Sequence, residues 1–313
     1  MSESLVQATD VARFYGDVVG VCDLSVTIPR GTVGLLGPNG AGKSTFLKLL
    51  VGELKPSRGQ IEVLGETPFS NPRLHARLGF CPQQDALWDE LTALEFVEFL
   101  LRLSGYEAAA ARRMGMEALE RVQLADVAQR RLKGFSKGMR QRTRIAQSIA
   151  HRPELVVLDE PLTGLDPLAR HATLELFRSL GSDGTSVVFS THVLHEVEAL
   201  TKNVVLLHRG RLLAGGEIAG IRTLLDRHPR RYTIQAREPR LLARELVTVD
   251  GVESVKFSGS KDSWLLTVET RSPDVLLREL PGIAARTRAG IGSLESRDEG
   301  LEAVFDYLMG GTA

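Results

Sequence analysis

Residues 37–45 read Gly-Pro-Asn-Gly-Ala-Gly-Lys-Ser-Thr, a glycine-rich loop in which four residues separate Gly37 from the run Gly42-Lys43-Ser44. The loop lies between an apolar segment, residues 33–36, and a helix-like stretch, residues 45–51. A strand, this spacing and a helix, in that order, are the context in which the pattern marks a phosphate-binding loop. The stretch therefore predicts an α/β core built around bound phosphate.

The residue types in the loop have a chemical reason to be there. Small residues let consecutive backbone N–H groups turn inward around an anion, and the following helix directs its positive end to the same point. The Lys43 ammonium can reach terminal phosphates, and the Ser44 hydroxyl is a hard oxygen ligand of the kind that Mg²⁺ prefers. We expect the whole loop to contact the phosphates: Gly37, Pro38, Asn39, Gly40, Ala41, Gly42, Lys43, Ser44 and Thr45.

A second motif lies about 115 residues further along the chain, where the apolar run 155–158 leads directly into Asp159 and Glu160. Carboxylates at the end of a buried strand are placed where sites in open α/β sheets gather. Together with the glycine-rich loop, this motif predicts a nucleotide triphosphatase.

Composition limits the function classes and the compartment. The 313 residues carry 39 Lys and Arg against 39 Asp and Glu, so no overall basic field attracts nucleic acid. The two cysteines, Cys22 and Cys81, lie far apart, which argues against a disulfide framework and for a reducing compartment such as the cytosol. We find neither a signal peptide nor 18 uninterrupted apolar residues, and we do not expect this chain to span a membrane alone.

The pattern along the chain predicts one α/β domain over residues 1–221. Apolar residues recur at helical spacing between residues 91 and 131, which favours a helical subdomain over about 88–150, although a plain helical surface layer fits the same spacing. Turn residues separate the short apolar segments of this domain. The predicted strands are residues 18–28, 33–36, 60–64, 155–158, 186–190 and 204–207.

Residues 222–313 have a different composition and predict a small C-terminal α+β domain. The basic run 227–231 is either a solvated linker or a patch for lipid or nucleic acid, and we favour the linker. Beyond it, strand, helix and strand occur twice in succession, which is the order of a ferredoxin-like split fold. This domain has no cluster of acids, histidines or cysteines, so we expect regulation or dimer contact rather than catalysis. The predicted elements are strands 232–236, 252–258, 264–270 and 291–296, helices 239–248 and 273–280, and a closing helix 301–308.

A third motif, Ser136-Lys137-Gly138-Met139, stands at the start of a helical stretch and precedes Asp159 by about twenty residues. The order of the phosphate loop, Gln83, this motif, Leu-Asp-Glu-Pro (residues 158–161), Gly-Leu-Asp (164–166) and Ser-Thr-His (190–192) resembles the ATP-binding cassette (ABC) ATPases. The resemblance covers residues 5–221. It implies a P-loop nucleoside triphosphatase fold and an ATPase that depends on Mg²⁺.

The resemblance also implies a role for single residues around ATP. Tyr15 matches the aromatic residue on which adenine stacks, and we favour this role over the alternative of a core tyrosine at a strand end. Gln83 matches the glutamine whose amide approaches Mg²⁺ and reports the nucleotide state to the membrane partner. Asp159 holds Mg²⁺ directly or through water, so the expected metal site consists of Ser44, Gln83 and Asp159.

Catalysis is expected to involve Lys43 and two residues near the strand ends. Glu160 matches the base that polarises the attacking water, and His192 matches the switch histidine that contacts the terminal phosphate. A lone histidine is more often structural, but this one follows an apolar strand. In this family Ser136 and Gly138 cap the ATP that a second subunit holds, so catalysis requires a head-to-tail dimer, with residues 164–166 along its seam.

Two departures from the usual motif point to one branch of the family. Lys137 stands where glycine is common and Met139 where glutamine is common, whereas Ser136 and Gly138 are kept. This form resembles the export branch that is paired with type-two permeases. The expected protein is then a cytoplasmic subunit, peripheral on the inner face of the cell membrane, that works with a polytopic permease and contacts it around residues 85–101.

Other functions remain as alternatives at this point. A soluble ABC-type ATPase that acts on ribosomes or nucleic acid is expected to have two cassettes in one chain or a long insertion, and neither is apparent here. A stand-alone kinase or GTPase does not explain the serine and glycine of residues 136–138. We therefore expect no nucleic-acid partner.

Overall fold

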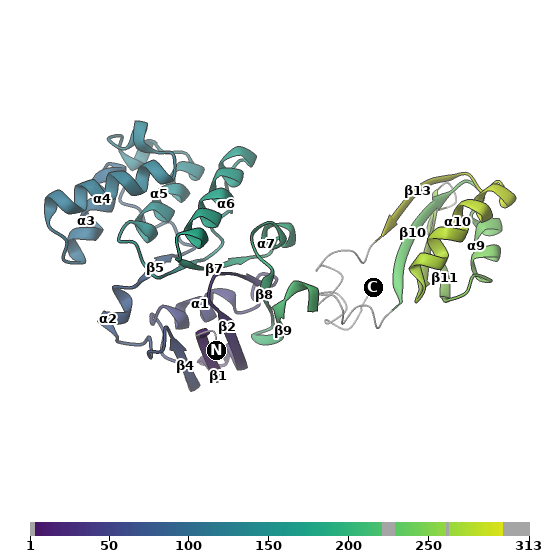
Figure 1. Cartoon of the computed structure of the whole chain (residues 1–313), viewed down its shortest axis with the longest axis horizontal. Coiled ribbons are helices and arrows are strands. Elements are labelled where there is room, and N and C mark those ends of the chain that lie inside the picture. The colour runs from purple at the N-terminus through teal and green to yellow at the C-terminus, as the bar shows by residue number, and fades with distance from the viewer. Residues whose placement is uncertain (1–3, 221–228, 261–262, 297–313) are drawn as a thin grey trace. The chain divides into compact units, whose positions relative to one another are not determined.

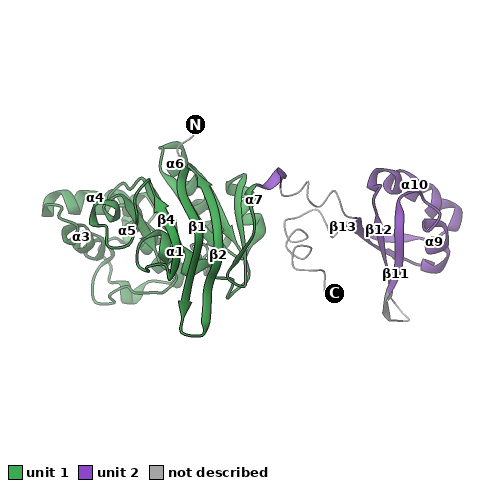
Figure 2. Ribbon diagram, turned by 90° about the horizontal axis from the view of Figure 1, so that it is seen from below, with its two compact units in different colours: residues 1–216 green, residues 217–313 purple. Residues whose placement is uncertain are grey.

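The structure is a computed structural model that describes residues 4–220, 229–260 and 263–296. The chain forms two compact units, residues 1–216 and 217–313, shown in different colours in Figure 2. Each unit is considered by itself. The domain boundary expected between residues 221 and 222 falls in a range that the structure does not describe.

The first unit begins with a three-stranded antiparallel sheet. Strands β1 (Ser4–Tyr15) and β2 (Val18–Pro29) are joined by a tight turn at Gly16 and Asp17, and β4 (Arg58–Val63) pairs with the other edge of β1. Gly16 has a φ of +61°, a conformation that glycine adopts without strain. The turn brings the end of β1 beside the start of β2.

The second sheet of this unit has six strands in the order β5-β6-β7-β3-β8-β9. The first five run parallel. Strands buried on both faces read as continuous apolar runs, and all four residues of β6 are buried. Their bounds are β5 (Leu78–Cys81), β6 (Leu155–Leu158), β7 (Ser186–Thr191), β3 (Thr32–Leu36), β8 (Asn203–His208) and β9 (Arg211–Glu217).

Helix α1 (Lys43–Leu50) packs between the two sheets (Figure 1). Phe46, Leu47 and Leu50 are fully buried, so most of this short helix is covered. The helix begins at Lys43, two residues before the predicted start, because Gly42 ends the loop in a left-handed conformation with φ +97°. The first turn of the helix therefore includes Ser44. The backbone N–H groups of this turn have no partner within the helix, and they form part of the phosphate loop.

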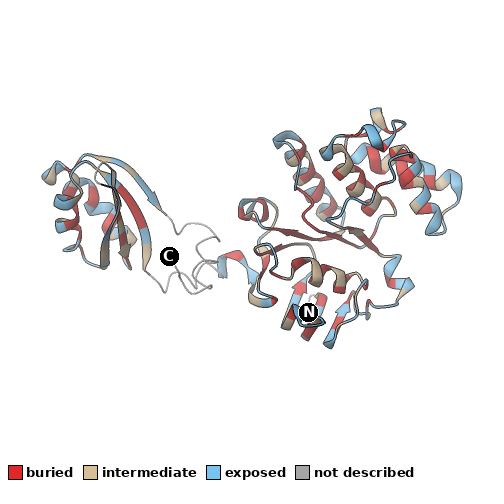
Figure 3. Ribbon diagram, turned by 180° about the vertical axis from the view of Figure 1, so that it is seen from behind, coloured by how far each residue is buried: buried red, intermediate tan, exposed pale blue. Residues whose placement is uncertain are grey.

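Helices α3 (Ala93–Leu103), α4 (Ala108–Arg121) and α5 (Lys137–Ile149) pack on one another and form the expected helical region. The start of α3 carries a capping box, in which Thr92 and Glu95 each bond the backbone N–H of the other. Figure 3 shows the buried positions of the unit gathered on its central strands and on the inner sides of the helices. The remaining helices are α2 (Pro72–His75), α6 (Pro167–Ser182) and α7 (Leu194–Leu200), with short 3₁₀ turns at Ala125–Val127 and Leu132–Gly134.

The second unit has the predicted order of elements. Its antiparallel sheet has the strand order β11-β12-β10-β13, and two helices cover one face over a shared apolar core. Strand, helix and strand repeated twice, with the first strand between the third and the fourth, is the ferredoxin-like arrangement. The bounds are β10 (Arg230–Ala236), α9 (Pro239–Leu246), β11 (Val252–Ser260), β12 (Ser263–Thr270), α10 (Pro273–Thr287) and β13 (Ile291–Ser296).

Two details of this unit differ from the sequence prediction. Arg230 and Arg231, expected in a linker, belong to β10, where they pair with Thr270 and Glu269. Helix α10 continues past Leu280, where the predicted helix ended, because its buried face extends to Ile283. The predicted closing helix, residues 301–308, lies outside the described residues.

Candidate functional site

The order of the parallel strands brings the distant motifs to one edge of the central sheet. The phosphate loop follows β3, Asp159 follows β6, His192 follows β7 and Gln83 follows β5. Because β5, β6, β7 and β3 are neighbours and parallel, their carboxyl ends lie side by side. Ligands of open α/β sheets bind outside this edge.

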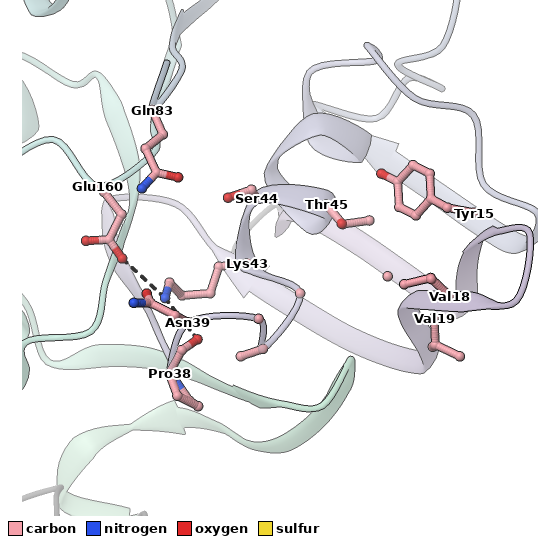
Figure 4. A pocket seen from close by; sticks show the side chains of 14 residues that line it. Tyr15, Val18, Val19, Pro38, Asn39, Lys43, Ser44, Thr45, Gln83 and Glu160 are labelled. Carbon is pink, nitrogen blue, oxygen red and sulfur yellow. Dashed lines mark hydrogen bonds and ion pairs between the residues drawn. The ribbon is translucent and has the colours of Figure 1, made fainter. Parts of the chain in front are cut away.

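A pocket of about 480 Å³ lies over the phosphate loop (Figure 4). Tyr15 lies at one end beside Val18, while Gln83 and Glu160 lie at the other end, with the loop between them. The complete lining is Tyr15, Val18, Val19, Gly20, Pro38, Asn39, Gly40, Ala41, Gly42, Lys43, Ser44, Thr45, Gln83 and Glu160. The structure therefore gathers most of the sequence-predicted residues around one cavity.

Close packing requires glycine at two positions of the loop, and at one of them the backbone conformation requires it as well. A Cβ atom on Gly42, whose φ is +97°, would lie 2.4 Å from the carbonyl oxygen of Gly20. A Cβ atom on Gly37 would lie 2.3 Å from the carbonyl oxygen of Leu207. Both contacts are with backbone atoms, which cannot move aside without a loss of stability, so no larger residue fits at either position.

Lys43 and Glu160 form a nearly buried ion pair across the pocket (Figure 4). The Nζ of Lys43 lies 3.2 Å from the Oε1 of Glu160, and the two side chains are only 6% and 7% exposed. The same ammonium donates to the carbonyl oxygens of Gly37 at 2.7 Å and Pro38 at 3.2 Å. The pair joins the loop to the end of β6 and places a mobile positive charge beside the carboxylate.

Glu160 is also fixed by its own backbone and by two neighbours. Its φ of +50° is uncommon for a residue other than glycine, and such conformations concentrate at functional sites. The Nδ1 of His192 lies 3.0 Å from its Oε2, and the Thr163 hydroxyl donates to the same oxygen at 3.2 Å. Lys43, His192 and Glu160 therefore converge on one point.

Asp159 lies next to this point but does not line the pocket. It is 2% exposed, and its Oδ1 accepts a hydrogen bond of 2.6 Å from the Ser190 hydroxyl. The same Ser190 oxygen accepts from the Glu160 N–H at 2.9 Å. The sequence prediction gave Ser190 no role. The parallel register, which pairs Leu158 with Phe189, is what brings the serine opposite the two carboxylates.

The aromatic end of the pocket also holds residues that the sequence prediction missed. Val18 and Val19 are exposed apolar side chains directly after the turn from Tyr15, and they extend the apolar surface beside its ring. The Arg13 guanidinium lies over the Tyr15 ring, 5.1 Å from its centroid. The available signal in the sequence was the pair of adjacent valines that follows Tyr15 and the turn residues Gly16 and Asp17. Tyr15 is 43% exposed, so the alternative of a core tyrosine was wrong.

Ser136 and Gly138, by contrast, do not line this pocket. Ser136 is the N-cap of α5, and its hydroxyl accepts from the Met139 N–H at 3.2 Å. A Cβ on Gly138 would lie 3.6 Å from Leu165, so this helix start is next to the Gly-Leu-Asp segment of residues 164–166. The structure thus separates these two residues from the other predicted nucleotide contacts.

The chemistry of the predicted metal ligands fits Mg²⁺. Ser44, Gln83 and Asp159 offer hydroxyl, amide and carboxylate oxygens, with no thiolate or imidazole among them. Within residues 4–220, 229–260 and 263–296, no group of three or more His, Cys, Asp or Glu side chains could hold a metal ion by itself. A site with one carboxylate suits Mg²⁺, which is commonly held by one or two carboxylates, water and substrate phosphates.

Burial and hydrogen bonding shift two titratable groups near the site. The Cys81 thiol, at the end of β5, has its pKa raised to about 12 by burial. The pKa of the Asp85 carboxyl, in the loop after Gln83, is lowered by its hydrogen bonds to Arg140.

In the part of the chain that the structure describes, no helix combines the length and the apolar character needed to cross a membrane.

Comparison with known proteins shows which family this chain is similar to. The family model described as ABC transporter matches residues 21–163. The daunorubicin/doxorubicin resistance ATP-binding protein DrrA of Streptomyces peucetius is 31% identical over 97% of this chain and 92% of its own. The Nod factor export ATP-binding protein I of Rhizobium sp. (strain N33) is 35% identical over 99% and 98%. A solved structure of an ATP-binding subunit of an ABC transporter aligns with a TM-score of 0.65 and 31% identity, over 71% of this chain and 93% of that one.

Proposed function

The chain belongs to the ABC transporter family as an ATP-binding, ATP-hydrolysing subunit, and we propose that two copies close around two ATP molecules to drive a separately encoded export permease. The observation that carries the proposal is the Glu160 carboxylate, which lines one end of the pocket formed by the phosphate loop and is contacted there by Lys43 and, from outside the pocket lining, by His192. At the other end, Tyr15 offers an exposed ring for the base.

Hydrolysis follows from the chemistry of these side chains. The backbone N–H groups of the loop and of the first turn of α1 bind the phosphates. Terminal phosphate oxygens give the Lys43 ammonium an anionic partner, which frees the Glu160 carboxylate to accept a proton from the attacking water. His192, already 3.0 Å from that carboxylate, orients it and contacts the terminal phosphate. Mg²⁺ held by Ser44, Gln83 and Asp159 would neutralise phosphate charge.

A second copy completes the site in this proposal. Ser136 and Gly138 lie at the start of a 13-residue helix, outside the pocket of their own chain. A helix start with a serine N-cap is suited to bind phosphate, so we assign this surface to the ATP held by a partner copy. Size-exclusion chromatography with light scattering tests this assignment. Glu160→Gln with ATP and Mg²⁺ should run as a dimer, and adding Ser136→Arg should return it to the monomer; dimerisation of the double variant would contradict the assignment.

The permease contact is proposed for the segment around residues 85–101. Trp88 is 50% exposed and its ring packs 4.9 Å from that of Phe99, which is itself 38% exposed. Leu87, in contrast, is only 8% exposed, so a charge there would disturb folding as well as docking. Trp88→Asp is therefore the informative change, and permease binding that is unaltered by it would refute the contact.

Export and a place at the inner face of the cell membrane are proposals supported by the relatives, which are named for drug resistance and for Nod factor export. The test is a pull-down of tagged Glu160→Gln from detergent-solubilised native membranes with ATP and Mg²⁺. Recovery of a polytopic membrane protein in near-equal amount is expected. Recovery of ribosomal or DNA-bound proteins alone would favour the alternative of an ATPase that acts on those partners.

A further inference from the structure

Two arginines of α5 hold the loop that carries Gln83. Arg140 and Arg144 are one helical turn apart, so they project from the same face of the helix. The Nη1 of Arg144 donates to three successive carbonyl oxygens, those of Pro82 at 3.0 Å, Gln83 at 2.9 Å and Gln84 at 2.6 Å. One side chain thus satisfies the backbone on both sides of Gln83.

Arg140 extends the same attachment further along the loop. Its Nε and Nη2 donate to the two carboxylate oxygens of Asp85 at 2.6 Å and 3.1 Å, a forked pair. Its Nη1 donates to Asp89 at 2.6 Å and to the carbonyl oxygen of Leu132 at 3.1 Å. The Arg140 side chain is 19% exposed, whereas Asp85 and Asp89 are 45% and 56% exposed, so these ion pairs are partly open to water.

The attachment joins two parts of the site that the chain separates by more than fifty residues. Gln83 lines the nucleotide pocket, and α5 starts next to Ser136 and Gly138. The loop from residue 82 to residue 91 belongs to neither a helix nor a strand. Side-chain bonds fix its path together with the backbone bonds that Leu132 and Lys133 donate to its far end. The two arginines therefore attach the loop that carries Gln83 to α5.

We propose that Arg144, supported by Arg140, is a positioning residue for ATP hydrolysis that locks the Gln83 loop onto α5. The side-chain amide of Gln83 lies in the pocket, and the start of α5 faces the nucleotide of the partner copy. With the lock in place, these two parts move together as one rigid body. The inference rests on the proposed function, in which both surfaces contact ATP. It predicts that loss of Arg144 lowers the rate of hydrolysis more than the affinity for ATP, because the phosphate loop itself makes no contact with this side chain.

The chain offers a matched control on the same helix. The Nη1 of Arg142 also donates to backbone carbonyl oxygens, those of Val122 and Gln123 at 3.2 Å each, but these lie at the end of α4 and not in the Gln83 loop. Arg142→Ala therefore removes an equivalent attachment of α5 to a different neighbour. An effect seen with Arg144→Ala and absent from Arg142→Ala belongs to the loop.

The experiment uses the full chain with Trp264→Phe, which leaves Trp88, inside the loop, as the single tryptophan of the chain. Steady-state ATP hydrolysis and acrylamide quenching of Trp88 emission are measured for Arg144→Ala, Arg144→Lys and Arg142→Ala. For Arg144→Ala we expect kcat to fall by about 10- to 100-fold, KM for ATP to stay within about threefold, and Trp88 quenching to rise. Arg144→Lys, which keeps a charged donor, should recover part of kcat.

The Trp264→Phe parent and the Arg142→Ala variant distinguish failure of the proposed function from failure of this inference. Hydrolysis by the Trp264→Phe parent establishes the ATPase activity independently, so its absence would count against the proposed function, and the quenching data would still test the attachment of the loop. Unchanged kcat and quenching in Arg144→Ala would overturn the inference. Equal losses in Arg142→Ala and Arg144→Ala would overturn it too, because they would trace the effect to general loosening of α5.

Discussion

Replacing Ser190 by alanine removes a single hydroxyl that joins both carboxylate residues of the site. The Ser190 oxygen donates to Asp159 at 2.6 Å and accepts from the Glu160 N–H at 2.9 Å, and the side chain is 0% exposed. Water cannot take its place without opening the sheet edge. The change therefore leaves one buried N–H and one buried carboxylate oxygen without this partner.

The magnitude follows from the two bonds. A hydrogen bond to a charged group contributes about 1.5–3 kcal/mol, and a buried N–H left without a partner costs about 1–3 kcal/mol. We expect Ser190→Ala to lower the free energy of unfolding by about 3–5 kcal/mol, a large fraction of the roughly 5–15 kcal/mol available to a domain. The kcat for ATP should fall as well, by at least about tenfold, since Glu160 loses the backbone bond that fixes its uncommon φ.

Urea unfolding monitored by Trp88 emission, in the Trp264→Phe background, measures the stability of the first unit. The control is Ser148→Ala, a serine that is 1% exposed and donates only within its own helix, to the Ile145 carbonyl oxygen. Such intrahelical bonds contribute little, so the control should lose less than about 1 kcal/mol. Equal stability losses in the two variants, or a native kcat in Ser190→Ala, would refute the account of Ser190.

Other predictions concern the cysteines and one buried glycine. Because burial raises the pKa of the Cys81 thiol to about 12 and also shields it from reagents, a thiol reagent should modify Cys22 in the folded chain and Cys81 only after denaturation. The Asp23 side chain raises the pKa of the Cys22 thiol, so Asp23→Asn should increase the thiolate fraction and the rate of labelling at fixed pH; a slower rate would contradict this assignment. A Cβ on Gly79 would lie 1.9 Å from the Ser148 carbonyl oxygen, so Gly79→Ala should lower the free energy of unfolding by about 1–3 kcal/mol or more in urea titration, and a loss under about 1 kcal/mol would contradict the packing.

Much of the architecture could be predicted from local pattern. The glycine-rich loop sets a strand before it and a helix after it, and β3 and α1 follow that order. In the second unit, alternating apolar residues and turn residues were enough to predict the ferredoxin-like order of elements. The prediction ended the helix at Leu280, whereas α10 runs on through Pro281 to Thr287: proline removes a helical hydrogen bond, and the packing of Ile283 in the core outweighs that loss.

The candidate site was predictable where a motif is continuous in sequence and not where it depends on contacts across the fold. Lys43 and Glu160 were identified from their motifs, and the structure places them 3.2 Å apart. The role of Ser190 depends on the register of two parallel strands, and the attachment of Arg144 joins segments about sixty residues apart. Neither contact can be predicted from a periodic pattern in the sequence, because contacts between distant residues depend on how the strands and helices assemble.

The central claim is that Glu160 is the base for hydrolysis of ATP held by the phosphate loop. The most direct test is the turnover of Glu160→Gln under saturating ATP and Mg²⁺, with ATP binding measured on the same preparation. Our account predicts that binding is kept within a few-fold, since the loop is intact, and that turnover falls by about 10²- to 10⁴-fold. Turnover close to that of the native chain, with binding intact, would contradict it.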